Sequence, residues 1–114
     1  MNWRKFPEEK PPKDLVVVTI LYSPDENKCV ACPLAYCPCD NCGWHTQDAI
    51  FKDAPVVEWL RLENLKKDSF DMFSKTLVNA TLVNAALEKD ETIEMVKKRA
   101  EDIYLVFTTE EAIG

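Results

Sequence analysis

Glycine is nearly absent from this chain, since Gly43 and Gly114 are the only two among 114 residues. A phosphate-binding loop needs several glycines, so this class of nucleotide site is excluded. Positive charge is also scarce, because 14 lysines and arginines stand against 20 aspartates and glutamates, for a formal net charge of −6. Phosphate contacts need a basic surface, so we expect no direct binding of DNA or RNA.

Long hydrophobic runs are missing as well, and none approaches the roughly 20 residues that cross a bilayer. The first 14 residues, "MNWRKFPEEKPPKD", are charged and proline-rich, with no apolar stretch typical of a signal peptide. We therefore expect a cytoplasmic protein that does not associate with membranes. The composition, 46% hydrophobic and 30% charged, is typical of a globular domain.

Cysteine and histidine, by contrast, are concentrated in one stretch of the chain. "CVACPLAYCPCDNCGWH", residues 29–45, contains all five cysteines and the only histidine. Its two Cys-x2-Cys pairs could each direct two thiolates at one ion, and four ligands complete a closed, tetrahedral structural zinc site. Gly43 can adopt the positive φ that such a turn often needs. The predicted ligands are Cys29, Cys32, Cys39 and Cys42, with Cys37 or His45 as alternative members.

Other interpretations of the same stretch remain open. The six-residue gap between the two pairs is shorter than in common zinc ribbons, and the cysteines could instead form disulfides or a redox-active cluster. An iron–sulfur cluster is a third alternative, although the spacing differs from that of ferredoxins. Free thiols in a packed loop are a fourth. A Cys–His nucleophile pair lacks any third group to orient the histidine.

The rest of the chain predicts an α+β fold. Residues 14–22, "DLVVVTILY", and 55–65, "PVVEWLRLENL", read as strands, with 45–54 as a second strand or an irregular return. Residues 68–89 and 91–107 have helical periodicity. We expect a three-stranded antiparallel β-meander over 1–65 that carries the zinc loop. An antiparallel two-helix hairpin over 66–114 then packs on it, or on a partner, within one compact domain. The clearest helical stripe is Ile93, Val96, Ala100, Ile103 and Phe107.

Four short motifs in the N-terminal half resemble a family of short phage and prophage proteins of unknown function. The matching pieces are Trp3, "PPKD" at 11–14, "LVVV" at 15–18 and "VVEWLRL" at 56–62. The resemblance implies a small antiparallel β-meander without known enzymatic activity. It assigns no functional residues. The cysteine-rich stretch and the helices after residue 65 are departures from the family pattern.

These observations favour a non-enzymatic, acidic protein-interaction module with a structural zinc site. If the resemblance holds, it would be a phage accessory protein that binds and inhibits a host defence factor in the host cytosol. The partner would be a host or viral protein. Two alternatives come from other classes: a small redox or metal-dependent enzyme that uses the cysteines, and a structural protein that forms homodimers through its helices.

Overall fold

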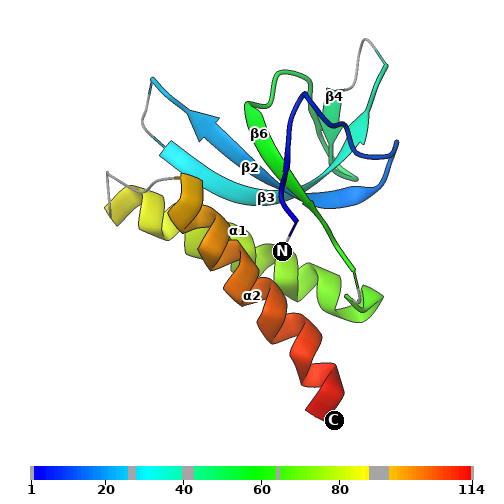
Figure 1. Ribbon diagram of the computed structural model, residues 1–114, viewed down its shortest axis with the longest axis vertical. Helices are drawn as coiled ribbons and strands as arrows, with labels where there is room; N and C mark the ends of the chain where they lie inside the picture. Colours follow the sequence, from blue (N-terminus) through cyan, green and yellow to red (C-terminus); the bar gives the residue numbers. More distant parts are fainter. Residues whose placement is uncertain (1, 26–27, 40–42, 64, 88–92, 114) are drawn as a thin grey trace.

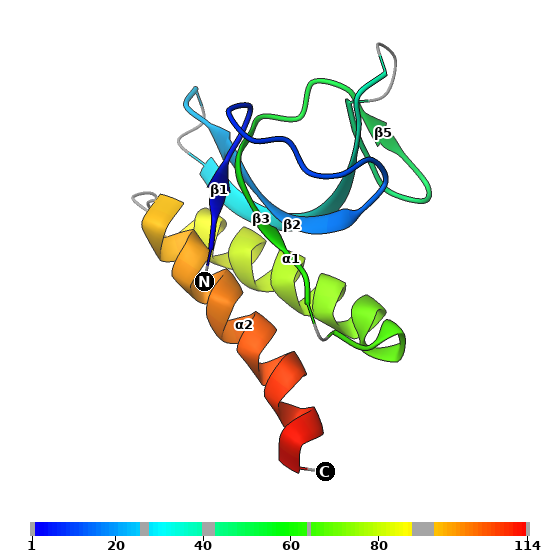
Figure 2. The same cartoon turned by 45° about the vertical axis from the view of Figure 1, so that its right-hand side comes forward.

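The computed structural model of the protein describes residues 2–25, 28–39, 43–63, 65–87 and 93–113. Within these ranges the chain forms one six-stranded sheet with the order β1-β6-β2-β3-β4-β5, and all neighbouring strands are antiparallel. Two helices lie against the same face of this sheet (Figures 1 and 2). The strands are β1 (Arg4–Lys5), β2 (Val16–Ser23), β3 (Lys28–Cys37), β4 (Gly43–His45), β5 (Ile50–Phe51) and β6 (Val56–Arg61). The helices are a 3-10 turn η1 (Lys67–Ser69), α1 (Phe70–Leu87) and α2 (Ile93–Ile113).

The prediction of a three-stranded meander with a metal-binding loop is wrong. Most of the predicted loop is β3, a ten-residue strand that pairs with β2 from Val16↔Ala35 to Ser23↔Lys28. The physical reason is that a buried cysteine behaves as a small hydrophobic residue, so residues 29–37 form a nearly continuous apolar run. The return stretch holds two short strands, β4 and β5, and the N-terminal segment adds β1 at the sheet edge.

The two predicted helices are present, and they run in opposite directions along the sheet (Figure 1). Their apolar stripes meet Val18, Ile20 and Leu60 of the sheet in one hydrophobic core. Phe73 and Leu77 from α1 are completely buried there. The stripe predicted on α2 also faces this core, with Val96 and Ala100 buried and Ile93, Ile103 and Phe107 packed at its margin.

A second core lies on the opposite face of the sheet, which curls around it (Figure 2). It is built from Val17, Leu34, Trp44, Val56 and Trp59. Phe6 from the N-terminal segment packs edge-on against Tyr36 and Trp44, with ring centroids 5.5 and 5.1 Å away. Successive side chains of a strand point to opposite faces, so the same strands serve both cores.

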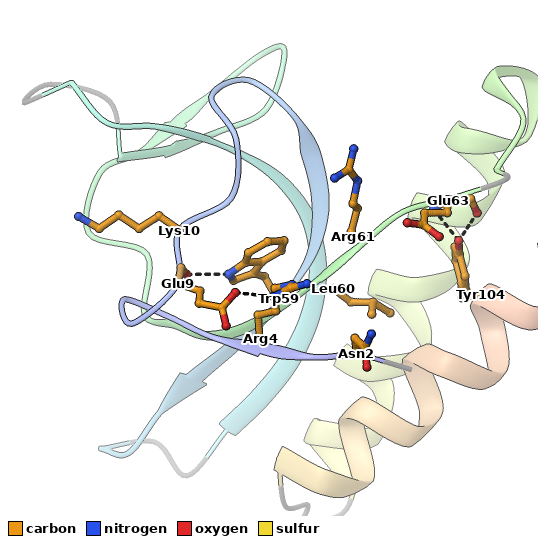
Figure 3. Close-up of a pocket in the computed structure, with 9 residues that line it drawn as sticks. All are labelled: Asn2, Arg4, Glu9, Lys10, Trp59, Leu60, Arg61, Glu63 and Tyr104. Carbon is orange, nitrogen blue, oxygen red and sulfur yellow. Dashed lines mark hydrogen bonds and ion pairs between the residues drawn. The ribbon is translucent and has the colours of Figure 1, made fainter.

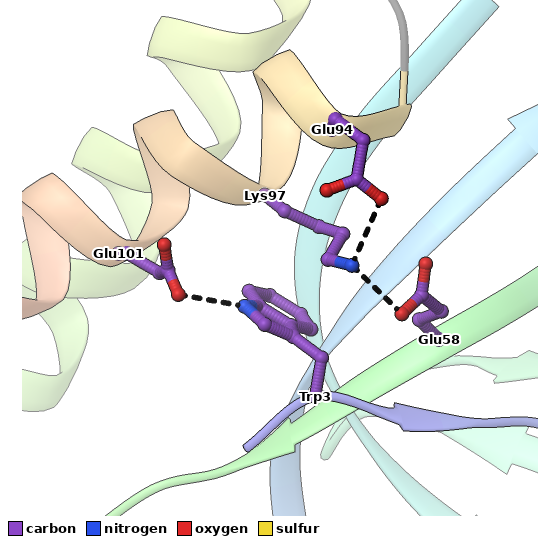
Figure 4. A network of polar contacts seen from close by, with 5 residues as sticks. All are labelled: Trp3, Glu58, Glu94, Lys97 and Glu101. Carbon is purple, nitrogen blue, oxygen red and sulfur yellow. Dashed lines mark hydrogen bonds and ion pairs between the residues drawn. The ribbon is translucent and has the colours of Figure 1, made fainter. Parts of the chain in front are cut away.

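The N-terminal segment is tied to the helical layer through Trp3. The indole Nε1 of Trp3 donates a hydrogen bond to Glu101 of α2 over 3.1 Å, and the Lys97 ammonium lies 5.8 Å from the Trp3 ring centroid (Figure 4). Lys97 in turn pairs with Glu58 of β6 at 3.0 Å. Trp3 and Phe6 therefore anchor this segment to the rest of the domain.

Candidate functional site

The predicted zinc ligands Cys29 and Cys32 lie on opposite faces of β3. Cys29, only 1% exposed, belongs to the core beneath the helices, whereas Cys32 packs against the core on the other face. Strand side chains alternate between faces, so two residues three positions apart cannot converge on one ion while β3 is formed. In a turn, Cys-x2-Cys spacing directs two thiolates at one ion, whereas in this strand it places the two thiols on opposite faces.

Cys29 and Cys39 are also separated along the strand. Eight residue steps lead from Cys29 to Cys37, and at ~3.3 Å per step this is roughly 26 Å before Cys39 is reached. Burial, and next the charge of Glu58, raise the pKa of Cys29 to about 11, and burial raises the pKa of Cys32. Without a metal ion, burial thus favours the protonated form of both thiols.

The structure therefore does not bring Cys29, Cys32 and Cys39 together. Across the described ranges, no group of three or more His, Cys, Asp and Glu side chains is placed to hold a metal ion. The fourth predicted ligand, Cys42, lies outside the described residues. Structural zinc thus stays a prediction, to which Cys29 and Cys32 could contribute only in a differently folded β3.

Two of the cysteines do meet, at the end of β3. The Cys37 thiol donates to the sulfur of Cys39 over 3.2 Å, and no disulfide is formed among the described cysteines. Cys37 also lines a pocket of about 590 Å³ together with His45 of β4. His45 is held there by Asp14, whose carboxylate lies 3.2 Å from the imidazole Nε2.

A second pocket, of about 510 Å³, lies at the other edge of the sheet beside β1 and β6 (Figure 3). Its aromatic wall is Trp59, whose Nε1 donates to the Glu9 carbonyl over 2.8 Å. Arg4 lies over the same ring at 5.9 Å and pairs with the Glu9 carboxylate at 2.5 Å. The remaining lining residues are Asn2, Lys10, Leu60, Arg61, Glu63 and Tyr104.

We call this site the Trp59 pocket. Positive charges outnumber negative charges in its lining. Three cations and two carboxylates line it, and Arg4 is already neutralised by Glu9. The side chains of Lys10 and Arg61 form no ion pair or hydrogen bond with any residue that the structure describes. Figure 3 shows them on two different sides of the Trp59 ring, one from the N-terminal segment and the other from β6. Beside its aromatic wall the pocket therefore offers two positive charges without an ion pair, Lys10 and Arg61, together with one further carboxylate, that of Glu63.

Sequence reasoning missed the Trp59 pocket. Trp59 is only 4% exposed, and nothing in the sequence pattern indicates that Arg4 and Lys10 lie beside it. The antiparallel register places Arg4 directly opposite Trp59, 55 residues later in the chain. Strand alternation in the sequence indicates only that Trp59 and Arg61 lie on one face of β6.

Comparisons with known proteins identify no relative. No protein-family model matches the chain, and no curated protein and no solved structure matches it. The resemblance to short phage proteins therefore stays a prediction. In the described part of the chain, neither helix combines the length and the apolar character that crossing a membrane requires.

Proposed function

We propose that this protein is a non-enzymatic interaction module that binds a carboxylate-rich segment of a partner protein in the Trp59 pocket. The observation that carries the proposal is the presence of Lys10 and Arg61 in the pocket without any ion pair to a described residue. Unpaired cations at the rim of a concave site favour anionic groups and accelerate their association. A pocket of about 510 Å³ is within the usual size range of binding sites.

The walls of the Trp59 pocket are held by contacts within the protein. The indole N–H is already used by the Glu9 carbonyl, and Arg4 is held by both Glu9 and the indole ring. The Tyr104 hydroxyl accepts a hydrogen bond from the Glu63 N–H over 2.6 Å and also contacts the Glu63 carbonyl. A site organised before binding loses less conformational entropy when a ligand enters, which supports a binding role.

The charge of the whole chain supports selectivity for a short acidic segment. A net charge of −6 repels extended polyanions such as nucleic acids, while a few carboxylates can approach a local pair of cations. The roles suggested by the sequence, a phage-encoded inhibitor of a host factor and a homodimer, stay predictions.

The proposal is tested by titrating the protein with acetyl-(Glu)4-amide and, as the uncharged control, acetyl-(Gln)4-amide, followed by amide and indole NMR shifts. We expect saturable shifts centred on the Trp59 indole, Lys10 and Arg61 for the glutamate peptide only. The Lys10→Gln/Arg61→Gln variant should bind roughly tenfold more weakly or worse, equivalent to about 1.4 kcal/mol.

Lys52→Gln/Lys75→Gln is the matched control, because it removes the same charge from two exposed positions outside the pocket. If both double variants weaken binding equally, the effect is one of net charge and the pocket assignment is wrong. NMR shift changes centred on another part of the surface would also contradict binding in the Trp59 pocket.

A further inference from the structure

We propose that Cys37 and Cys39 form a dithiol site that low-molecular-weight disulfides reversibly oxidise to an intramolecular Cys37–Cys39 disulfide. The inference rests on a direct juxtaposition: the two sulfurs lie 3.2 Å apart, and Cys37 borders an open pocket of about 590 Å³. It is independent of the Trp59 pocket, which lies at the opposite edge of the sheet.

Local backbone structure brings the two sulfurs together. Cys37 is the last residue of β3, and the chain bends at Cys39 immediately after Pro38. In a straight strand, the side chains of residues i and i+2 stand nearly 7 Å apart. The bend closes most of this distance, and the proline ring restricts the backbone between the two cysteines. A disulfide bond measures ~2.04 Å, so the sulfurs need to approach by only about 1.2 Å more.

The two thiols differ in exposure, which assigns them different roles. Cys39 is exposed, whereas Cys37 is buried, with 9% of its surface accessible. Access controls which thiol meets a soluble disulfide first. Cys39 is therefore the attacking thiol, and Cys37, protected but in contact with Cys39, is the resolving thiol.

The exchange balances with the disulfide as the only oxidant. The Cys39 thiolate attacks one sulfur of RSSR, the S–S bond breaks, and one RS⁻ leaves, so that Cys39 carries a mixed disulfide. The Cys37 thiolate then attacks the Cys39 sulfur and displaces the second RS⁻. Two electrons pass from the cysteine pair to RSSR, and the two thiol protons end on two molecules of RSH.

The pocket beside Cys37 is lined by charged and polar groups. His45 lines it with 26% of its side chain exposed, and Asp14 orients its ring at 3.2 Å. Lys13 contributes a positive charge and Asp48 a second carboxylate to the same lining. Of the other two described cysteines, Cys29 is fully enclosed, and Cys32 lines a pocket of about 400 Å³ whose only charged residue is Asp53.

The test uses the full reduced chain in a glutathione redox buffer, quenched with acid, alkylated, and mapped by mass spectrometry. We expect oxidation to remove two hydrogens from the peptide with Cys37 and Cys39, while Cys29 stays alkylatable only after unfolding. The same result in the Cys42→Ser variant shows that Cys42 is not the partner. In Cys37→Ser/Cys42→Ser, the reaction should stop at one glutathionyl group on Cys39, which persists at least about tenfold longer.

Three results would overturn the inference. One is a disulfide that joins Cys42 to Cys37 or Cys39 in the natural chain. Another is a Cys39→Ser/Cys42→Ser variant in which Cys37 becomes glutathionylated as quickly as Cys39 does in its partner variant. The third is one zinc ion per chain by elemental analysis, with Cys37 and Cys39 unreactive until a chelator is added. Unchanged circular dichroism of each variant ensures that folding is not the cause.

Discussion

The hydroxyl of Thr81 in α1 accepts a hydrogen bond from the backbone N–H of Ala31 in β3 over 3.2 Å, and both residues are completely buried. The same hydroxyl donates to the Leu77 carbonyl at 3.0 Å. Beyond β2, the described partner of β3 is β4, which pairs only with residues 35–37. A helix side chain therefore satisfies a strand N–H that no neighbouring strand reaches.

Replacing Thr81 by valine tests this contact. Valine has nearly the same shape but cannot accept a hydrogen bond, so the Ala31 N–H would be buried without a partner. We expect the free energy of unfolding to fall by about 1–3 kcal/mol in urea denaturation. Thr76→Val on the same helix is the control, with an expected change within about 0.5 kcal/mol. Equal losses of unfolding free energy in the two variants would show that the Thr81–Ala31 hydrogen bond makes no specific contribution to stability.

The Lys97–Glu58 pair predicts a non-additive response to mutation. Only 15% of the Lys97 side chain and 11% of the Glu58 side chain are exposed, and their charged atoms lie 3.0 Å apart (Figure 4). Lys97→Met leaves the Glu58 carboxylate buried without its cation, so we expect a loss of about 2–4 kcal/mol. Lys97→Met/Glu58→Gln should recover at least half of that loss, because no charge is then stranded. Strictly additive losses in a double-mutant cycle would contradict direct coupling.

Buried Cys29 predicts a loss of stability at alkaline pH. Burial first, and the Glu58 charge second, raise the pKa of Cys29 from 9.0 to about 11. The folded state therefore holds this proton more tightly than the unfolded state. Its stabilising contribution is complete below pH 9.0 and disappears as the pH rises through about 11. Between these values, the unfolding free energy should fall by up to about 1.4 kcal/mol per pH unit.

Cys29→Ala isolates the alkaline effect of the thiol from that of Lys97. Burial alone would lower the pKa of Lys97, but the hydrogen bonds and charges of Glu58 and Glu94 outweigh it, so the pKa is raised above 10.5. Lys97 therefore stays charged in both states over most of the range from pH 8 to 10. Urea denaturation over this range should show a smaller slope against pH for Cys29→Ala than for the natural chain. If unfolding free energy falls with pH equally in both proteins, the pKa of Cys29 is the same in the folded and unfolded states.

Gly43 is required at the start of β4 for two separate reasons. Its φ is +65°, and a Cβ added there would lie 2.6 Å from the backbone oxygen of Lys52. We expect Gly43→Ala to lower the unfolding free energy by at least about 1–2 kcal/mol from the left-handed conformation alone, and by more through the clash. Gly43→Asn separates the causes, because asparagine accommodates positive φ but also carries a Cβ. If the clash matters, Gly43→Asn should lower the melting temperature nearly as much as Gly43→Ala does. An unchanged melting temperature in Gly43→Asn would exclude the clash.

Much of the secondary structure could be predicted from local sequence, while the site could not. The β-branched run before Tyr22 and the helical stripe through Val96 and Ala100 were predicted correctly, because each pattern reflects burial of one element. The positive φ at Gly43 was also anticipated. β3 was misread because its cysteines were counted as metal ligands and not as small apolar residues.

What the sequence by itself determined is the two helices, the strands β2 and β6, and which of their side chains are hydrophobic, since these follow from the spacing of residues a few positions apart. Only the tertiary structure decided which functional groups meet. Strand alternation separates Cys29 from Cys32, a bend joins Cys37 to Cys39, and the pairing of β1 with β6 places Arg4 over Trp59. These side-chain contacts depend on strand register and on how the sheet curls, and both are set by contacts between residues distant in the chain.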